Sequence, residues 1–301
     1  MLKEGEMFYR HPSWSPSVTK SPVRALVSLT SAESKRLIAK GVAILPEVRQ
    51  ALERGLVVIA RGTTNAFVVE EVAGVKVEPK AHYAAGVVVD GELSANPPGV
   101  RMKPIVLRQG KPVGISPAEA LQEFREDDVF IKGANAVDAE GNAGVLAAGD
   151  RGGTIGEALP VLLPRGSYLL VPVGLEKLIP SVARAAQATG IFRFKYSTGL
   201  PAGLVPMSNA LVVTEVQAFR ALTGVEAVPV AAGGIAGSEG AVVLALEGEE
   251  AQIEQALSLL KAIKGEPPVS RPAARVNPPA AAFNYDAMAQ WQTLHPVPRP
   301  S

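Results

Sequence analysis

The segment LVVIARGTTNAFVVEEVAG, residues 56–74, decides the fold class because a buried strand gives way to a helix within a few residues. The apolar run that begins at Leu56 is typical of a parallel strand covered on both faces. Gly62 then permits a tight turn, and a helix is expected to begin at Thr63 or Thr64. A strand followed directly by a helix is the repeating unit of α/β proteins, so we expect the same alternation in the flanking sequence.

The alternation continues on both sides of this segment. Thr30 and Glu33 have the spacing of a capping box at a helix start, and Ser116 and Glu119 repeat it. Pro46 is expected to begin another helix, since proline is favoured at the first helical position. The sequence also predicts a strand in YAAGVVVDGEL (83–93), a hairpin in KPIVLRQGKPVGI (103–115), a strand in VFIKGANAVD (129–138) and a helix in LEKLIPSVARAAQATG (175–190).

This order predicts an α/β fold with two folded parts and two arms. Residues 22–204 are expected to form a Rossmann-like domain, with a mostly parallel sheet and helices on both faces. Residues 205–266 read β-α-β-β-α, which indicates a small C-terminal α+β domain. Residues 1–21 form an N-terminal arm, and residues 267–301 form a C-terminal tail too rich in proline for regular structure.

Composition excludes several classes of site. The chain has no cysteine, which excludes disulfides, thiolate metal sites and a cysteine nucleophile. Its three histidines, His11, His82 and His295, are far apart in sequence, so we expect neither a histidine-rich metal site nor a Ser-His-Asp triad. The net charge is +1, so we expect no basic face suited to nucleic acid. No cofactor and no metal ion are expected.

The first residues and the length of the apolar stretches predict a cytoplasmic protein. The first residues lack the apolar core of a signal peptide, and no apolar stretch reaches the roughly 18 residues of a membrane helix. We therefore expect a soluble cytoplasmic protein with no membrane partner. Trp14 and Trp291 lie in the two arms, and exposed tryptophan is enriched at interfaces, which predicts a homo-oligomer.

Polar residues gather where predicted strands end, and this pattern predicts a ligand site. Two Gly-Thr helix starts offer amides and a positive dipole to an anion, and lysines close to strand ends can neutralise it. Ordinary alternatives remain at each position: Thr63 or Thr64 as an N-cap, Asp138 and Glu140 in a solvated turn, and Lys177 at a surface helix start. The candidate ligand-binding residues are Gly62, Thr63, Thr64, Asn65, Lys132, Asn135, Gly152, Gly153, Thr154 and Lys177.

Three of these segments resemble one superfamily, that of ribose-5-phosphate isomerase, glucosamine-6-phosphate deaminase, the CoA transferases and the DeoR-type sugar effector domains. IARGTTNAFVVEEV is similar to its first Gly-Thr-Thr loop and helix. DVFIKGANAVDAEGNAGV resembles the DeoR-type G-A-N-G-I-D-x-E-G pattern, and LLVPVGLEKL resembles a strand that ends near a lysine, here Lys177. The resemblance covers about residues 50–180. It implies an isomerase-like cleft and a phosphorylated sugar as one class of ligand.

One departure from that superfamily favours binding over turnover. The isomerases place an aspartate where this chain has Asn135, and an amide is no general base near neutral pH. The glutamate nucleophile of the CoA transferases has no matching motif here, and residues 1–21 are too short for the DNA-binding domain that normally precedes the effector domains.

The sequence therefore predicts binding of a phosphorylated or otherwise anionic small metabolite without an obvious catalytic carboxylate, with Asn135 orienting a carbonyl or hydroxyl. An alternative is a phosphosugar isomerase or lyase of the same fold. Its base would be Asp138, Glu157 or Glu176. A third is an oligomeric scaffold with a vestigial cleft.

Overall fold

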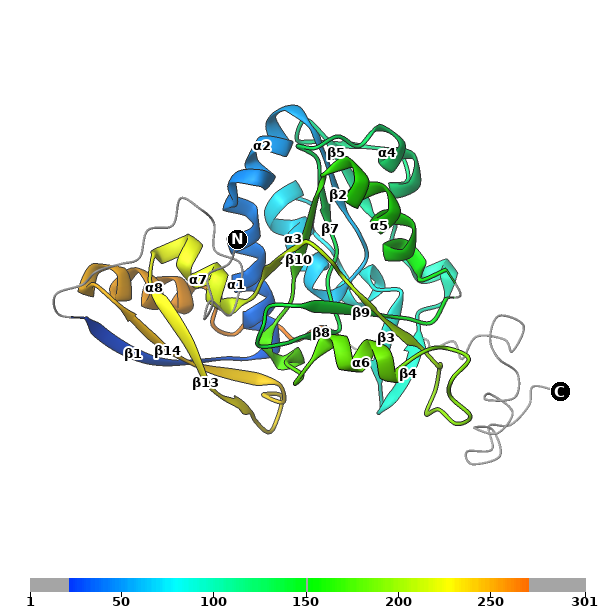
Figure 1. Cartoon of the computed structure of the whole chain (residues 1–301). Helices are drawn as coiled ribbons and strands as arrows, with labels where there is room; N and C mark the ends of the chain where they lie inside the picture. The colour runs from blue at the N-terminus through cyan, green and yellow to red at the C-terminus, as the bar shows by residue number, and fades with distance from the viewer. Residues whose placement is uncertain (1–21, 150, 271–301) are drawn as a thin grey trace.

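A computed structural model describes residues 22–149 and 151–270 of the chain (Figure 1). These ranges contain eight α-helices and a mixed, mostly parallel sheet of six strands. The predicted α/β class is confirmed at this level. The two arms, with Trp14 and Trp291, lie outside the described residues apart from the beginning of the tail. Within the described ranges, no helix combines the length and apolar character needed to cross a bilayer.

The six-stranded sheet carries the core of the molecule, in the order β12-β10-β7-β2-β5-β6. Strands β12, β10, β7 and β2 run parallel, β5 pairs antiparallel with β2, and β6 completes the predicted hairpin antiparallel to β5. The four parallel carboxyl ends therefore share one edge. The bounds are β2 Leu56–Ile59, β5 Ile105–Arg108, β6 Lys111–Val113, β7 Val129–Ile131, β10 Tyr168–Pro172 and β12 Ala210–Val213.

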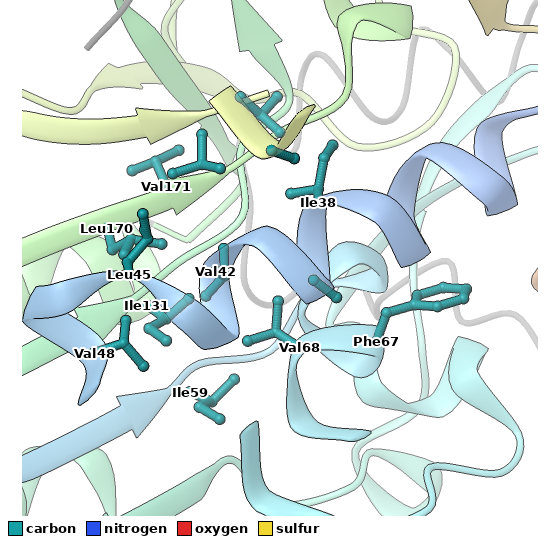
Figure 2. Packing of buried hydrophobic residues seen from close by; sticks show 14 of the residues in the cluster. Ile38, Val42, Leu45, Val48, Ile59, Phe67, Val68, Ile131, Leu170 and Val171 are labelled. Carbon is teal, nitrogen blue, oxygen red and sulfur yellow. The ribbon is translucent and has the colours of Figure 1, made fainter. Parts of the chain in front are cut away.

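Helices lie on both sides of this sheet, with α1, α2 and α3 on one side and α4 and α5 on the other (Figure 1). Both predicted capping boxes are present, at Thr30 before α1 and at Ser116 before α4. Ile38 and Val42 of α1 belong to the same buried cluster as Ile131 and Leu170 of the sheet (Figure 2). Each such aliphatic side chain, once buried, contributes about 1.5–3 kcal/mol. The bounds are α1 Ser31–Ile44, α2 Pro46–Arg54, α3 Thr63–Ala73, α4 Pro117–Glu123 and α5 Gly153–Arg165.

A separate three-stranded antiparallel sheet, β1-β14-β13, is covered on one face by helices α7 and α8 (Figure 1). The sheets do not divide at residue 204. Strand β1, from the start of the described chain, pairs with β14, whereas β12, from beyond residue 204, extends the six-stranded sheet. The bounds are β1 Val23–Leu29, α7 Glu215–Thr223, β13 Glu226–Gly233, β14 Ala241–Gly248 and α8 Glu250–Ile263.

Two predicted elements differ in the structure. The strand expected over residues 83–93 is a hairpin, β3 and β4, because Asp90 and Gly91 both adopt positive φ and reverse the chain. The helix expected over residues 175–190 is two short helices, since Pro180 lacks an N–H and cannot continue a helix. The remaining bounds are η1 Lys80–Tyr83, β3 Gly86–Val89, β4 Glu92–Ala95, η2 Pro98–Val100, β8 Ala136–Val137, β9 Ala143–Ala147, η3 Leu175–Lys177, α6 Val182–Ala188 and β11 Gly203–Pro206.

Helix α1 packs against strands of both sheets and crosses α7 closely at Gly41. A Cβ on Gly41 would lie 2.8 Å from both Cα and Cβ of Ala218, so the helices cannot accept one without moving apart. We expect Gly41→Ala to lower the free energy of unfolding by about 1–3 kcal/mol. Gly99→Ala is the control, because a Cβ on Gly99 meets open space. Urea unfolding of both variants measures the difference, and equal stability would show that this crossing is loose.

Candidate functional site

The polar side chains that follow the four parallel strands gather at one edge of the six-stranded sheet. Arg61 and Gly62 follow β2, Lys132 follows β7, Glu176 and Lys177 lie in η3 beyond β10, and Glu215 begins α7 after β12. Neighbouring strands hold these ends in register, since the amide of Ala60 donates to the carbonyl of Ile131 at 2.9 Å and that of Lys132 to Leu170 at 2.9 Å. Ligands gather at such edges in α/β sheets.

Glu176 is the central carboxylate of this edge. Its Oε1 lies 3.1 Å from Nζ of Lys35, a buried lysine that also bonds Ser31. Its Oε2 is buried and finds no hydrogen-bond partner among the described residues. Burial alone would raise the pKa of Glu176, but the charges of Lys177 and Lys35 hold it below its ordinary value. The result is an ionised carboxylate with one oxygen left to bind a ligand or accept a proton.

Two glycines make room for that carboxylate. A Cβ on Gly174 would come within 1.8 Å of Oε2 of Glu176, so the carboxylate lies directly over the backbone before η3. Gly240, in the turn between β13 and β14, would place a Cβ 3.4 Å from the Cβ of Glu176. The Gly-rich connection Gly233–Gly240 joins β13 to β14, and its end lies beside Glu176.

Glu215 lies beneath the edge and is fully buried. Both of its carboxylate oxygens accept the amide of Leu175, at 3.0 and 3.3 Å, which fixes the start of η3. Burial, followed by repulsion from Glu176, raises the pKa of Glu215 to about 7. Glu215 is therefore a positioning residue that holds Glu176 and Lys177 at the edge.

Lys132 and Lys177 are cations with few partners. Nζ of Lys132 donates to the carbonyl of Gly133 at 3.2 Å, and Nζ of Lys177 donates to Ala134 at 3.0 Å. Lys177 also lies 4.0 Å from Glu176. Burial, and then the charge of Lys177, lowers the pKa of Lys132 to about 8. Burial likewise lowers the pKa of Lys177. Each ammonium group would gain from a bound anion.

Arg61 and Arg101 add a second pair of cations. Nε of Arg61 donates to the carbonyl of Met102 at 2.8 Å, and Nε of Arg101 donates to Asn96 at 2.6 Å. Among the described residues, neither guanidinium has a carboxylate within ion-pair distance. Burial, and then the nearby charge of Arg61, lowers the pKa of Arg101. Two uncompensated guanidinium groups close together favour an oxyanion between them.

The first Gly-Thr turn is present, but the backbone conformation of Gly62 differs from the tight turn that was expected. Gly62 is the N-cap of α3, so neither Thr63 nor Thr64 is the cap, and among residues 22–149 and 151–270 no side chain caps this helix. The φ of Gly62 is 165°, an extended conformation open to any residue, and its added Cβ would be no closer than 3.7 Å to another residue. Gly62 is therefore not required for a tight turn.

Asn65 and Thr64 are buried at that helix start. Nδ2 of Asn65 donates to the carbonyls of Ala60 and Ile131, at 2.7 and 3.1 Å, and so ties the end of β2 to that of β7. Its Oδ1 and the hydroxyl of Thr64 are buried, and neither has a hydrogen-bond partner in the part of the chain that the structure describes. Such groups cost free energy unless a ligand or water meets them.

Asn135 and Asp138 hold the loop that follows Lys132. Oδ1 of Asn135 accepts the amide of Leu146 at 3.0 Å, and the side chain is exposed. The interpretation of Asp138 as part of a solvated turn is wrong, because this carboxylate is buried. It accepts backbone amides from Glu140, Asn142 and Val182. With its oxygens so occupied, Asp138 is a loop-organising residue and a poor general base. Glu140 is exposed.

The second Gly-Thr turn belongs to another sheet. Gly152, Gly153 and Thr154 begin α5 after β9, and β9 pairs antiparallel with β8 and β11. The two Gly-Thr turns therefore follow strands of different sheets. A Cβ on Gly152 would face Val205 of β11, at 3.7 Å. Glu157, one turn into α5, is exposed.

Sequence reasoning missed four residues of this site. Glu215 follows the end of β12 directly. Polar residues at the ends of parallel strands are how Lys132 was identified, and the same reasoning identifies Glu215 once β12 is known to belong to the parallel sheet. Arg61 stands within the quoted turn. Lys35 and Arg101 carry no local signal, because α1 and the loop before β5 reach the site only through the fold.

The chain matches no protein-family model, no curated protein and no solved structure. The resemblance to the isomerase superfamily therefore stays a prediction. Within residues 22–149 and 151–270, no three His, Cys, Asp or Glu side chains are grouped to hold a metal ion.

Proposed function

We propose that the protein binds an anionic small metabolite, with a phosphorylated compound as the first candidate, at the carboxyl edge of the parallel strands. The observation that carries this proposal is the set of cations at that edge with mainly backbone carbonyls as partners: Lys132, Lys177, Arg61 and Arg101. Charges so poorly compensated are costly unless a counter-ion binds. The uncapped start of α3 adds amides and a positive dipole beside them.

The architecture around this edge fits a Rossmann-like domain, and β1, β13 and β14 with α7 and α8 fit a smaller α+β unit beside it. We include both in the proposal, together with a cytoplasmic location suited to a cysteine-free chain and self-association through the tryptophan-bearing arms. Light scattering at micromolar concentration, with and without residues 271–301, tests the self-association. A monomer in both cases would exclude it.

A thermal-shift screen tests the binding. At 100 times its dissociation constant, a specific anion should stabilise the fold by about 2.7 kcal/mol, which raises the melting temperature by a few degrees. The screen uses inorganic phosphate, sugar phosphates, nucleotides, CoA and carboxylates against sodium chloride at equal ionic strength. We expect Arg101→Met and Lys177→Met to reduce the shift.

Lys103→Met is the matched control, since Lys103 is an exposed cation two residues from Arg101. If no anion shifts the wild-type protein beyond the salt control, or if Lys103→Met weakens binding as much as Arg101→Met, the proposal is wrong.

A second candidate function is acid–base catalysis on the bound anion, and one observation favours it. Glu176 is ionised, and its Oε2 has no partner. Of the three carboxylates that the sequence offered as bases, it is the one at this edge. Glu176→Gln replaces this carboxylate with an amide, so it should abolish any turnover found with sugar phosphates while phosphate binding survives. Full activity in this variant would remove Glu176 as the base.

A further inference from the structure

Lys132 holds a central position at the edge. It follows β7, which pairs with β2 on one side and β10 on the other. Its backbone amide donates to Leu170, so the residue remains part of the sheet hydrogen bonding. The residue as a whole is half-buried, so it is neither enclosed in the core nor free in solvent.

The ammonium group of Lys132 is poorly stabilised. Its hydrogen-bond partner is the carbonyl of the next residue, Gly133, and among the described residues no carboxylate lies within ion-pair distance of Nζ. The nearby charge of Lys177 adds repulsion, and burial adds desolvation. With a pKa of about 8, about a quarter of Lys132 is the free amine at pH 7.5. An ordinary lysine has about one part in a thousand.

We propose that Lys132 is a nucleophile that condenses with the aldehyde or ketone group of an anionic metabolite. A desolvated lysine beside a second cation is the arrangement that activates amines for this reaction. The inference rests on the proposed function in that Lys177, Arg61 and Arg101 hold the anionic end of the same molecule. The carbonyl group then lies at the lysine.

The reaction balances without another reagent. The amine nitrogen of Lys132 forms a bond to the carbonyl carbon, and the π electrons move to the oxygen, which takes up a proton as the nitrogen loses one. The nitrogen lone pair then forms the C=N bond while the hydroxyl group departs with a proton as water. Both hydrogens of that water come from the amine, and nothing is oxidised or reduced.

The test uses pyridoxal 5′-phosphate, a probe that carries both an aldehyde and a phosphate. The full chain is incubated with the probe and sodium cyanoborohydride, which reduces the imine to a stable amine, and labelled lysines are identified by peptide mass spectrometry. At pH 7.5 we expect labelling of Lys132 to be about tenfold faster than that of Lys76. Lys76 is the internal control, because its side chain is 80% exposed.

Two variants and a pH series sharpen the result. Labelling at Lys132 should reach half its maximum near pH 8. Lys177→Met removes the repelling charge and should move that midpoint to higher pH. Lys132→Arg keeps the positive charge but cannot form an imine, so labelling at this position should vanish while labelling of the exposed Lys76 continues at its wild-type rate.

The two proposals can fail separately. If Lys132 is labelled no faster than Lys76, the nucleophile inference is overturned, even where phosphate shifts the melting temperature. If Lys132 is labelled selectively but no anion shifts the melting temperature, the inference holds and the proposed binding of free anions fails.

Discussion

Arg36→Met is expected to lower the free energy of unfolding by about 3 kcal/mol, because half-buried Glu266 loses the cation it pairs with and, among the described residues, Glu70 and Glu71 keep only Lys80 and Lys40. Arg36 of α1 reaches Glu70 at 2.6 Å, Glu71 at 2.9 Å and Glu266 at 2.9 Å, and its side chain is only 13% exposed. Its guanidinium carbon also lies 4.9 Å from the ring centre of Phe67. These contacts join α1 to α3 and to the segment after α8.

Arg108→Met is the matched control for this prediction. Arg108 pairs with Glu123 in a similar geometry, at 2.9 Å, but the two side chains are 43% and 52% exposed. An exposed pair of this kind contributes up to about 1 kcal/mol. Urea unfolding at pH 7 should therefore separate the two variants clearly. Equal losses would mean that the Arg36 network is solvated and contributes as a surface pair does.

Glu215→Gln should stabilise the protein at pH 8 by about 3 kcal/mol and change little at pH 4.5. Because the pKa of Glu215 is raised to about 7 in the folded state, the folded chain keeps a proton that the unfolded chain has released above its lower pKa. Wild-type stability therefore falls as pH rises between about 4.5 and 7. Glutamine removes this loss and still accepts the amide of Leu175.

The groups that face Glu215 set the design of this experiment. They are Glu176 and Lys177 of η3, Ser34 of α1 and the amide of Leu175. Unfolding is measured at several pH values, and the control is Glu33→Gln. The pKa of Glu33 is lowered despite burial, by bonds from Thr30, Gly265 and Lys264, so its variant should lose stability mainly above pH 5. Parallel pH curves for wild type and Glu215→Gln would contradict the assignment.

Local signals in the sequence were enough for most elements and for half of the site. Capping boxes located α1 and α4, and strand ends located Lys132, Glu176 and Lys177. These features depend on neighbours within a few residues, which a single sequence displays.

The remaining features depend on partners distant in sequence. No pattern in VRALVSL states that β1 pairs with β14, so the division of strands between sheets was misjudged, and Glu215 was missed with it. Residue identity also does not reveal dihedral angles. Gly62 was expected to permit a tight turn, whereas its φ of 165° is an extended conformation that any residue can adopt. Likewise, Asp138 looks solvated in sequence, and only the loop it organises buries it.

The pairing of β1 with β14 has a consequence for synthesis of the chain. Leu29 must wait for Val242, more than 200 residues later, before its sheet can form. At typical translation rates that delay is roughly 10–40 s. Throughout this time both edges of β1 are unpaired. The strand also carries the apolar Leu26, which remains 73% exposed even in the finished fold. Nascent chains of this protein should therefore depend on chaperone binding near their N-terminus until the last hairpin emerges.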